Sequence, residues 1–310
     1  MKIELNENKI YFNSGKSVQE IHPFWLRERV DGEEFLDKGT QQRLFDPSTM
    51  NGEIDIKKAE IKNGFLEVNF NDGVNSKIDI SKLETEFSNK DTVIKSIPKK
   101  KWDSTLKDVK NFEFKEGFYE SKEMYDLLVA FYEYGFVIIK NVPTENNYIV
   151  KFANSIGSVR RTNFGEHFNV KSKSNPNDLA YTTLHLSPHT DNPYRNPVPC
   201  IQLLHCIENE VSGGYSTLVD GYTVTENLKK NDPDAYKILT EVKVRFKFTD
   251  KNVMLEDWSE LIHLDDEKNF KQVRFSPRLD YVPMLEKDKL DQYYKARKKI
   301  SDLYNSEKNR

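Results

Sequence analysis

The sequence contains very little cysteine. Its 310 residues include only Cys200 and Cys206, which are too few for a disulfide framework and are not spaced as a C-x-x-C pair for zinc or redox chemistry. Long apolar runs are also lacking. The start, MKIELNENKIYF, has no apolar core of the kind found in signal peptides, and no stretch reaches the length of a membrane span. These absences predict a cytoplasmic protein that does not enter a membrane.

Neither sign of charge dominates. The 47 basic and 50 acidic residues give a net charge of −3, so there is no overall attraction to nucleic acid or to an anionic membrane, and neither is expected as a partner. Hydrophobic residues make up 37% and charged residues 31%, a balance typical of a globular protein with a polar surface. The length allows a small domain beside a larger one, and a homodimer is a possible assembly.

Short strands broken by turns dominate the first third of the chain. The segment 65–70 alternates apolar and polar residues and ends at Asn71-Asp72-Gly73, a hairpin signal, with 77–80 as a partner strand. The lysine-rich stretch 95–110, which contains Pro98, is typical of a linker. We therefore expect a small N-terminal β-rich domain at residues 1–95 and a second domain at residues 96–310.

Several segments of the second domain have helical spacing. Ser121 is a suitable N-cap, and the apolar residues after it recur at intervals that bury one face until Gly135 ends the helix. The segment 181–220 instead resembles strands and loops. The expected elements are a helix at 121–134 with Met124, Leu127, Leu128 and Phe131 on its buried face, a buried strand at 136–139, and helices at about 146–156, 223–240 and 286–304.

The sharpest local feature is the sequence Ser187-Pro188-His189-Thr190-Asp191. On an extended segment residues i and i+2 project to the same face, so His189 and Asp191 can bind one metal ion from one side. Such a pair is two thirds of the 2-His-1-carboxylate triad of Fe(II) oxygenases. A structural role for His189 has about equal weight on the spacing alone. A second copy, His263-Leu264-Asp265, lies in a polar stretch that favours an exposed hairpin turn.

The first copy stands among several ordered motifs. Residues 181–221 read YTTLHLSPHTDNPYRNPVPCIQLLHCIENEVSGGYSTLVDG, in which HTD, QLLHC and GG-x-S-x-x-VDG follow one another. In order and spacing this core resembles the family of γ-butyrobetaine dioxygenase and trimethyllysine dioxygenase, within the taurine dioxygenase superfamily. The following NLKKNDPDAYKIL fits the same family, and FWLRERVDG and RLFDPS near positions 24–48 more loosely resemble its small N-terminal domain. The resemblance covers most of residues 115–305.

The resemblance implies a fold and a reaction. The fold is mainly β with flanking helices, built on a double-stranded β-helix (jelly roll). His189 and Asp191 would be the catalytic metal ligands for Fe(II), with 2-oxoglutarate as co-substrate and O₂ as oxidant. Ser216 matches a position whose hydroxyl contacts 2-oxoglutarate, although a serine after Gly213-Gly214 suits a turn equally well. The implied activity is hydroxylation of a small trimethylammonium compound, in carnitine-type biosynthesis or in the catabolism of quaternary amines.

The family holds the trimethylammonium head in an aromatic cage by cation–π attraction. By spacing to the HTD motif, the cage positions fall on Phe164, Phe168 and Tyr181, with Asn192 where the family often has another aromatic residue. Packing in a core is the alternative role for each ring. Asp178 stands where eukaryotic members have an asparagine near the substrate carboxylate, and an aspartate would repel that carboxylate. Trimethylaminoethylphosphonate or a longer amine is therefore an alternative to γ-butyrobetaine as substrate.

Two further family features concern metal ligands. The N-terminal domain often carries a structural zinc on cysteines and a histidine, but the stretch ERVDGEEFLDKGTQQRLFD contains no cysteine, so no structural zinc is expected. Relatives also continue past their last long helix into strands that supply a second histidine ligand and an arginine for 2-oxoglutarate. No such signature follows Leu303. We therefore expect a jelly roll that is incomplete at its C-terminus, with His167, His185 and His205 as conceivable third ligands.

Two interpretations of the chain stay open. It is either an oxygenase in truncated form, or a relative of the same fold that lacks catalysis and acts as a binding or partner protein. The ordered motifs favour the first interpretation, and the missing triad member favours the second. Succinate release that depends on 2-oxoglutarate, iron and ascorbate would separate them. The exact substrate and the oligomeric state are not specified by the sequence.

Overall fold

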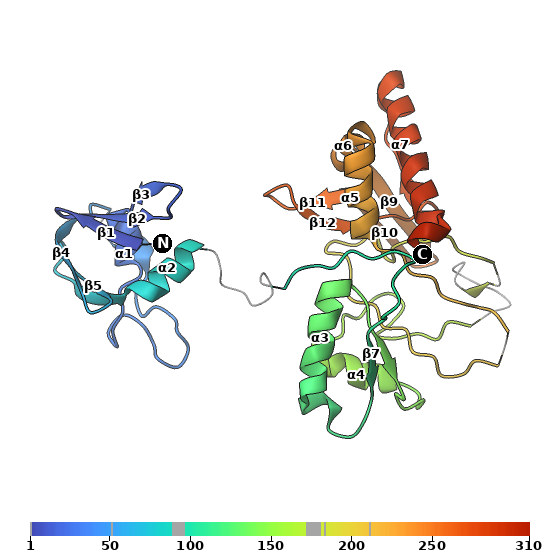
Figure 1. Cartoon of the computed structure of the whole chain (residues 1–310), viewed down its shortest axis with the longest axis horizontal. Helices are drawn as coiled ribbons and strands as arrows, with labels where there is room; N and C mark the ends of the chain where they lie inside the picture. Colours follow the sequence, from blue (N-terminus) through green and yellow to red (C-terminus); the bar gives the residue numbers. More distant parts are fainter. Residues whose placement is uncertain (1, 51, 89–96, 172–180, 183, 211) are drawn as a thin grey trace. The chain divides into compact units, whose positions relative to one another are not determined.

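The structure is a computed structural model that describes residues 2–50, 52–88, 97–171, 181–182, 184–210 and 212–310. It divides into two compact units, Met1–Pro98 and Lys99–Arg310 (Figure 1). Each unit has hydrophobic clusters of its own and is described by itself. The smaller unit corresponds to the β-rich segment, and the larger unit carries the ordered motifs.

The described residues of the smaller unit form two antiparallel sheets of three strands and two helices. The predicted hairpin is present in the second sheet, where the strand at Phe65–Phe70 pairs with the strand at Asn75–Asp79. Alternate residues of the first of these strands are buried, as its alternating pattern predicted. The elements are β1 (Lys2–Asn6), β2 (Lys9–Asn13), β3 (Val18–Glu20), α1 (Pro23–Arg27), η1 (Pro47–Thr49), β4 (Ile56–Lys62), β5 (Phe65–Phe70), β6 (Asn75–Asp79) and α2 (Ile80–Ser88).

The larger unit is centred on a sheet that three helices cover on one face. Side chains of the middle strand, Val244, Phe246 and Phe248, are buried in one cluster with residues from all three helices. The strands run in the order β10 (Val253–Glu260), β9 (Lys243–Asp250) and β13 (Asp280–Tyr281), and a separate two-stranded sheet pairs β11 (Ile262–Leu264) with β12 (Phe270–Val273). The elements are α5 (Gly221–Asn231), α6 (Pro233–Glu241), β9 (Lys243–Asp250), β10 (Val253–Glu260), β11 (Ile262–Leu264), β12 (Phe270–Val273), β13 (Asp280–Tyr281), α7 (Lys287–Asn305) and η5 (Glu307–Asn309).

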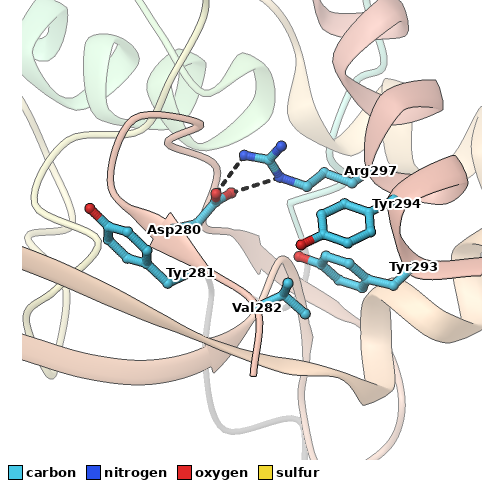
Figure 2. Close-up of a pocket in the computed structure, with 6 residues that line it drawn as sticks. All are labelled: Asp280, Tyr281, Val282, Tyr293, Tyr294 and Arg297. Carbon is cyan, nitrogen blue, oxygen red and sulfur yellow. Dashed lines mark hydrogen bonds and ion pairs between the residues drawn. The ribbon is translucent and has the colours of Figure 1, made fainter. Parts of the chain in front are cut away.

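An ion pair fixes α7 to the edge of this sheet. Arg297 donates hydrogen bonds from Nη2 and Nε to the two carboxylate oxygens of Asp280, at 2.5 and 3.3 Å (Figure 2). Burial raises the pKa of Asp280, and this effect outweighs the opposing hydrogen bond and charge of Arg297. The pair borders a cavity of about 290 Å³ that is also lined by Tyr281, Val282, Tyr293 and Tyr294.

The helix predicted after Ser121 is present as α3 (Lys122–Tyr134). The Ser121 side chain accepts a hydrogen bond from the backbone nitrogen of Met124 at 3.3 Å, and Gly135 ends the helix with φ of 78°. Leu127 is buried as expected, but Leu128 is exposed because each residue turns about 100° around the helix axis. The helix packs with α4 (Tyr148–Ile156) and η3 (Phe118–Glu120) around a smaller cluster.

The strand predicted to be buried at 136–139 lies instead in a two-stranded ribbon. It is β8 (Ile138–Lys140), which pairs in parallel with β7 (Asn111–Glu113). Ile138 is exposed. An apolar run is typical of a strand covered on both faces, and the described residues do not supply that cover.

The lysine-rich stretch predicted as a linker is packed on the larger unit from Lys99 onward. The indole nitrogen of Trp102 donates to the carbonyl oxygen of Tyr134 at 2.8 Å, and its backbone nitrogen donates to the Thr223 hydroxyl at 3.1 Å. Lys100 pairs with Glu133 at 2.8 Å. The linker prediction is therefore wrong for this part of the stretch.

The segment 181–220 differs from the expectation of strands. Its described residues belong to no named helix or strand, and several apolar side chains in it are exposed, including Leu204 at 70% and Tyr215 at 91%. The described strands of the whole chain form five sheets of two or three strands. They do not close into a barrel, so the jelly roll remains an expectation here. No helix in the described ranges is long and apolar enough to cross a bilayer.

Candidate metal centre and aromatic cluster

The candidate metal centre is the turn that carries His189 and Asp191. The Nε2 atom of His189 lies 3.2 Å from Oδ1 of Asp191. On the other side of the ring, Nδ1 lies 2.8 Å from the carbonyl oxygen of Ser187. Because a carbonyl oxygen only accepts hydrogen bonds, Nδ1 must carry a proton, which leaves Nε2 as the nitrogen that can bind a metal. The two side chains therefore face one another with one nitrogen and one oxygen.

His189 and Asp191 each shift the pKa of the other. The hydrogen bond to Asp191 raises the pKa of His189, and the same bond lowers the pKa of Asp191. Partial burial opposes both shifts. When His189 carries a second proton, that proton lies on Nε2 between the two atoms that would bind a divalent cation, and metal binding would displace it.

Gln202 holds the second carboxylate oxygen of Asp191. Its Nε2 donates to Oδ2 of Asp191 at 3.0 Å, which leaves Oδ1 facing the imidazole. Contacts of this kind fix the orientation of a metal ligand. Gln202 belongs to the QLLHC motif but was not among the predicted site residues. The contact depends on how the chain folds back over 11 residues, which local spacing does not indicate.

A second contact braces the turn between the two candidate ligands. The backbone nitrogen of Thr190 donates to the carbonyl oxygen of Phe275 at 2.7 Å, and the Phe275 nitrogen donates to the Thr190 hydroxyl at 2.9 Å. The buried Arg274 also donates from Nη1 to the carbonyl oxygen of Pro193 at 3.3 Å. The segment after β12 therefore anchors the HTD turn. Sequence reasoning missed this contact because the partners lie 85 residues apart.

The second His-x-Asp copy is used locally. Nδ1 of His263 lies 3.2 Å from a carboxylate oxygen of Glu260. Asp265 accepts hydrogen bonds from the backbone nitrogens of Glu267 and Asn269, at 3.0 and 2.8 Å, which closes the turn between β11 and β12. The predicted hairpin turn is confirmed, and each group of this copy has a nearby structural partner.

The donor atoms of the first pair suit Fe(II). A neutral imidazole nitrogen and a carboxylate oxygen match two of the three protein positions of the facial triad. Among the residues that the structure describes, no group of three or more His, Cys, Asp or Glu side chains is suited to a metal. His167 and His185 are exposed, and the buried Nε2 of His205 has no hydrogen-bond partner within the same described ranges. A third ligand therefore stays unassigned.

The three side chains predicted as an aromatic cage lie together. The ring centroid of Phe168 is 5.5 Å from that of Phe164 and 6.5 Å from that of Tyr181. Tyr181 is buried while Phe168 is 49% exposed, so the cluster has an open side. The rings meet at 43° and 86° rather than stacking face to face.

Ring contacts link this cluster to the residue after Asp191. Phe164 lies 5.6 Å from Phe248, and Phe248 stacks on Tyr194 at 5.1 Å between centroids. The Tyr194 hydroxyl donates to Oδ1 of Asn192 at 3.0 Å. Phe164 also packs against the main core, so the alternative structural role applies to it more than to Phe168.

The remaining predicted site residues are less clearly placed. Asn192 directs its carbonyl group toward Tyr194 and Arg195, so its side chain fixes the turn. Ser216 is exposed on a stretch without regular structure. Asp178 lies outside the residues that the structure describes.

A histidine and a carboxylate that face one another supply two of the three protein ligands in the 2-His-1-carboxylate triad of mononuclear non-haem iron oxygenases. The sequence family described as "Taurine catabolism dioxygenase TauD, TfdA family" matches residues 103–310. The chain belongs to this family of dioxygenases. The match takes in the HTD turn, the QLLHC motif and the segment that anchors them.

The chain is also similar to individual dioxygenases of two kinds. The chain is 26% identical over 291 residues to γ-butyrobetaine dioxygenase of Pseudomonas sp. (strain AK-1), which covers 92% of this chain and 76% of that protein. It is 32% identical over 215 residues to γ-butyrobetaine dioxygenase of Homo sapiens, which covers 67% of this chain and 55% of the human protein. Mitochondrial trimethyllysine dioxygenase of Rattus norvegicus is 27% identical over 250 residues. These residues make up 78% of this chain and 58% of the rat protein. The chain thus spans little more than half of the two mammalian relatives.

Proposed function

We propose that this chain hydroxylates a small trimethylammonium compound with Fe(II), O₂ and 2-oxoglutarate. The observation that carries the proposal is the convergence of His189 Nε2 and Asp191 Oδ1 on a turn anchored to Phe275. The aromatic cluster of Phe164, Phe168 and Tyr181 supports the substrate class. Family membership and the names of the relatives support the reaction class.

In this proposal each side chain has a defined task. His189 and Asp191 hold the iron, and the bond from Nδ1 to the Ser187 carbonyl keeps the imidazole ring in its orientation. Gln202 keeps Oδ1 of Asp191 directed at the metal position. Bound iron with 2-oxoglutarate supplies the activation of O₂, which no protein side chain can provide. Ser216 is the candidate contact to 2-oxoglutarate.

The aromatic cluster positions the substrate. Its ring faces attract a quaternary ammonium group, whose charge cannot be satisfied by hydrogen bonds. The buried Tyr181 excludes water on one side of the cluster, and the exposed Phe168 borders the open side. Candidate substrates are γ-butyrobetaine, trimethyllysine and trimethylaminoethylphosphonate, the last favoured if Asp178 repels a carboxylate.

The test is succinate release from 2-oxoglutarate in the presence of Fe(II) and ascorbate, with each candidate substrate added in turn. We expect release that depends on one of the trimethylammonium compounds and that is abolished by His189→Ala or Asp191→Ala. His263→Ala and Asp265→Ala are the matched controls and should retain the activity. Activity that survives His189→Ala and is lost in His263→Ala would contradict the assignment.

A binding protein without catalysis is the competing function. It would bind trimethylammonium ligands through the same cluster and release no succinate. Calorimetry with the three ligands, run beside the succinate assay, separates these outcomes. If only neutral or anionic ligands bind, the aromatic cluster is a core element and the substrate class is wrong.

A further inference from the structure

The VDG motif places a glycine against the strand that leads to the HTD turn. Gly221 is the first residue of α5, and α5 packs beside β12 (Figure 1). A Cβ atom on Gly221 would lie 2.9 Å from Cγ2 of Val273, the last residue of β12, and 3.7 Å from its Cγ1. Carbon atoms in contact prefer separations of about 3.5–4.0 Å. Even an alanine at position 221 would therefore come too close to Val273.

This position uses the absence of a side chain and not a special backbone conformation. Gly221 lies in a helix, whose backbone angles are open to every residue except proline. Gly213 and Gly214 of the same motif instead have φ of 99° and 68°, and a Cβ atom on either would meet nothing within 4 Å in the described ranges. These two glycines serve a turn, whereas Gly221 serves a close contact. The facing Val273 is β-branched and stiff, so it adapts less readily than a long side chain.

The start of α5 is fixed more firmly than β12. The Asp220 side chain caps the helix by accepting from the backbone nitrogen of Tyr222 at 3.0 Å, and Val224 and Leu228 are buried in the main cluster. The strand β12 has four residues and belongs to a two-stranded sheet. We therefore expect the strand, and not the helix, to move when a side chain is added at Gly221.

The last residue of β12 is followed directly by the two residues that hold the HTD turn. Arg274 donates to the carbonyl oxygen of Pro193 at 3.3 Å. Phe275 is joined to Thr190 by hydrogen bonds of 2.7 and 2.9 Å. Such hydrogen bonds are confined to separations of about 2.7–3.2 Å, so even a small displacement of β12 strains this anchor.

We propose that Gly221 is a positioning residue for the candidate metal centre, an inference that rests on the proposed function. Because position 221 carries no side chain, α5 approaches β12 closely enough for that strand to hold the HTD turn in place. The effect reaches His189 and Asp191 through β12 and the hydrogen bonds at Thr190. A residue that only packs a helix on a strand would change stability and leave the metal affinity unaffected.

The experiment measures Mn(II) affinity and unfolding for variants of the whole chain, with Mn(II) in place of Fe(II) so that no turnover occurs. Gly221→Ala introduces the close contact, and the double variant Gly221→Ala/Val273→Ala relieves it by shortening the facing side chain. Val273→Ala alone reports the effect of the shortening. Gly157→Ala is the matched control, since Gly157 ends α4 with φ of 177° and a Cβ atom there would meet nothing within 4 Å among the described residues.

We expect Gly221→Ala to weaken Mn(II) binding about three- to tenfold, because the ligands lose part of their orientation. The double variant should return to within about twofold of Val273→Ala, a recovery that only residues in contact produce. Gly157→Ala should bind Mn(II) as the wild type does. Unchanged Mn(II) affinity in Gly221→Ala, or a double variant that does not recover, would overturn the inference.

A further variant covers the case in which Gly221→Ala does not fold. Val273→Ile keeps the glycine and enlarges the side chain on the other side of the same contact. It should weaken Mn(II) binding about twofold or more, for the same reason as Gly221→Ala. Mn(II) affinity equal to that of the wild type in folded Val273→Ile would then contradict the proposal.

Hydrogen exchange of the Thr190 amide is a readout that needs no metal. Its nitrogen donates to the carbonyl oxygen of Phe275 at 2.7 Å, so its exchange should become about tenfold faster in Gly221→Ala and recover in the double variant. Equal acceleration of the Thr190 amide and the amides of β9 would mean that Gly221 serves packing alone, which contradicts the inference. If the wild type binds no Mn(II), the proposed function fails, and the exchange rates still decide the role of Gly221.

Discussion

Two regions of the larger unit differ sharply in how they are supported. The sheet β10-β9-β13 lies under α5, α6 and α7, and its inward side chains are buried in one continuous cluster. The segment 181–220 carries the candidate metal ligands, yet its described residues form no named helix or strand and expose several apolar side chains. The difference indicates that the stability of this unit and its chemistry reside in separate parts of the chain.

The largest effect should come from the covered sheet. Phe246 in β9 is fully buried, so Phe246→Ala is expected to lower the free energy of unfolding by about 3–5 kcal/mol through lost burial and a residual cavity. Leu204→Ala is the matched change in the other region and should alter it by less than about 0.5 kcal/mol. Denaturant unfolding followed by circular dichroism measures both. Similar losses for the two variants would remove the distinction between the regions.

The contact between α7 and the sheet should respond to pH. Arg297→Met leaves the carboxylate of Asp280 buried beside an apolar group. We expect this change to lower the free energy of unfolding by about 2–4 kcal/mol at pH 7. This value is smaller than for a fully buried pair because the Arg297 side chain is 28% exposed. The pKa of Asp280 is already raised above its ordinary value, and removing the cation raises it further. Protonation therefore relieves the cost as the pH falls from 7 toward 4.

Asp280→Asn is the control for this prediction. It keeps an oxygen acceptor for Arg297 and removes the buried charge. The free energy of unfolding of Asp280→Asn should therefore stay within about 1 kcal/mol of the wild-type value. The part of the pH dependence of stability that Asp280 contributes should disappear. Unfolding curves at pH 4, 5.5 and 7 compare the three proteins. A cost of Arg297→Met that grows on acidification would mean that the sign assigned to Asp280 is wrong.

A smaller effect is expected where the two regions meet. Thr190→Val removes the hydroxyl that accepts from the Phe275 backbone nitrogen, and the unpaired nitrogen should cost about 1–2 kcal/mol. Because Thr190 lies between His189 and Asp191, Mn(II) affinity should fall as well. Thr190→Ser keeps the hydroxyl and should preserve both quantities. Unchanged Mn(II) affinity in Thr190→Val would show that the anchor to Phe275 does not orient the ligands.

The sequence-based predictions succeed where local patterns determine structure. The N-cap at Ser121, the left-handed Gly135, the hairpin around Gly73 and the turn at Asp265 each depend on residues within a few positions of one another. Leu128 was predicted on the buried face of its helix but is exposed. Periodicity alone does not show how wide the buried face is, because this depends on which elements cover it.

The candidate site was only partly predictable for the same reason. The two candidate ligands lie two positions apart, so spacing alone could indicate the pair. Their supports are distant in sequence: Gln202 follows Asp191 by 11 residues, and Phe275 follows Thr190 by 85.

The most direct test of the central claim is a Mn(II) titration monitored by the loss of the free-ion electron paramagnetic resonance signal. The account predicts that the wild type and His263→Ala bind Mn(II) with the same affinity, and that His189→Ala and Asp191→Ala each weaken binding by about tenfold or more. Affinity that is insensitive to His189→Ala, or that is lost in His263→Ala, would contradict the assignment of the HTD turn as the metal centre.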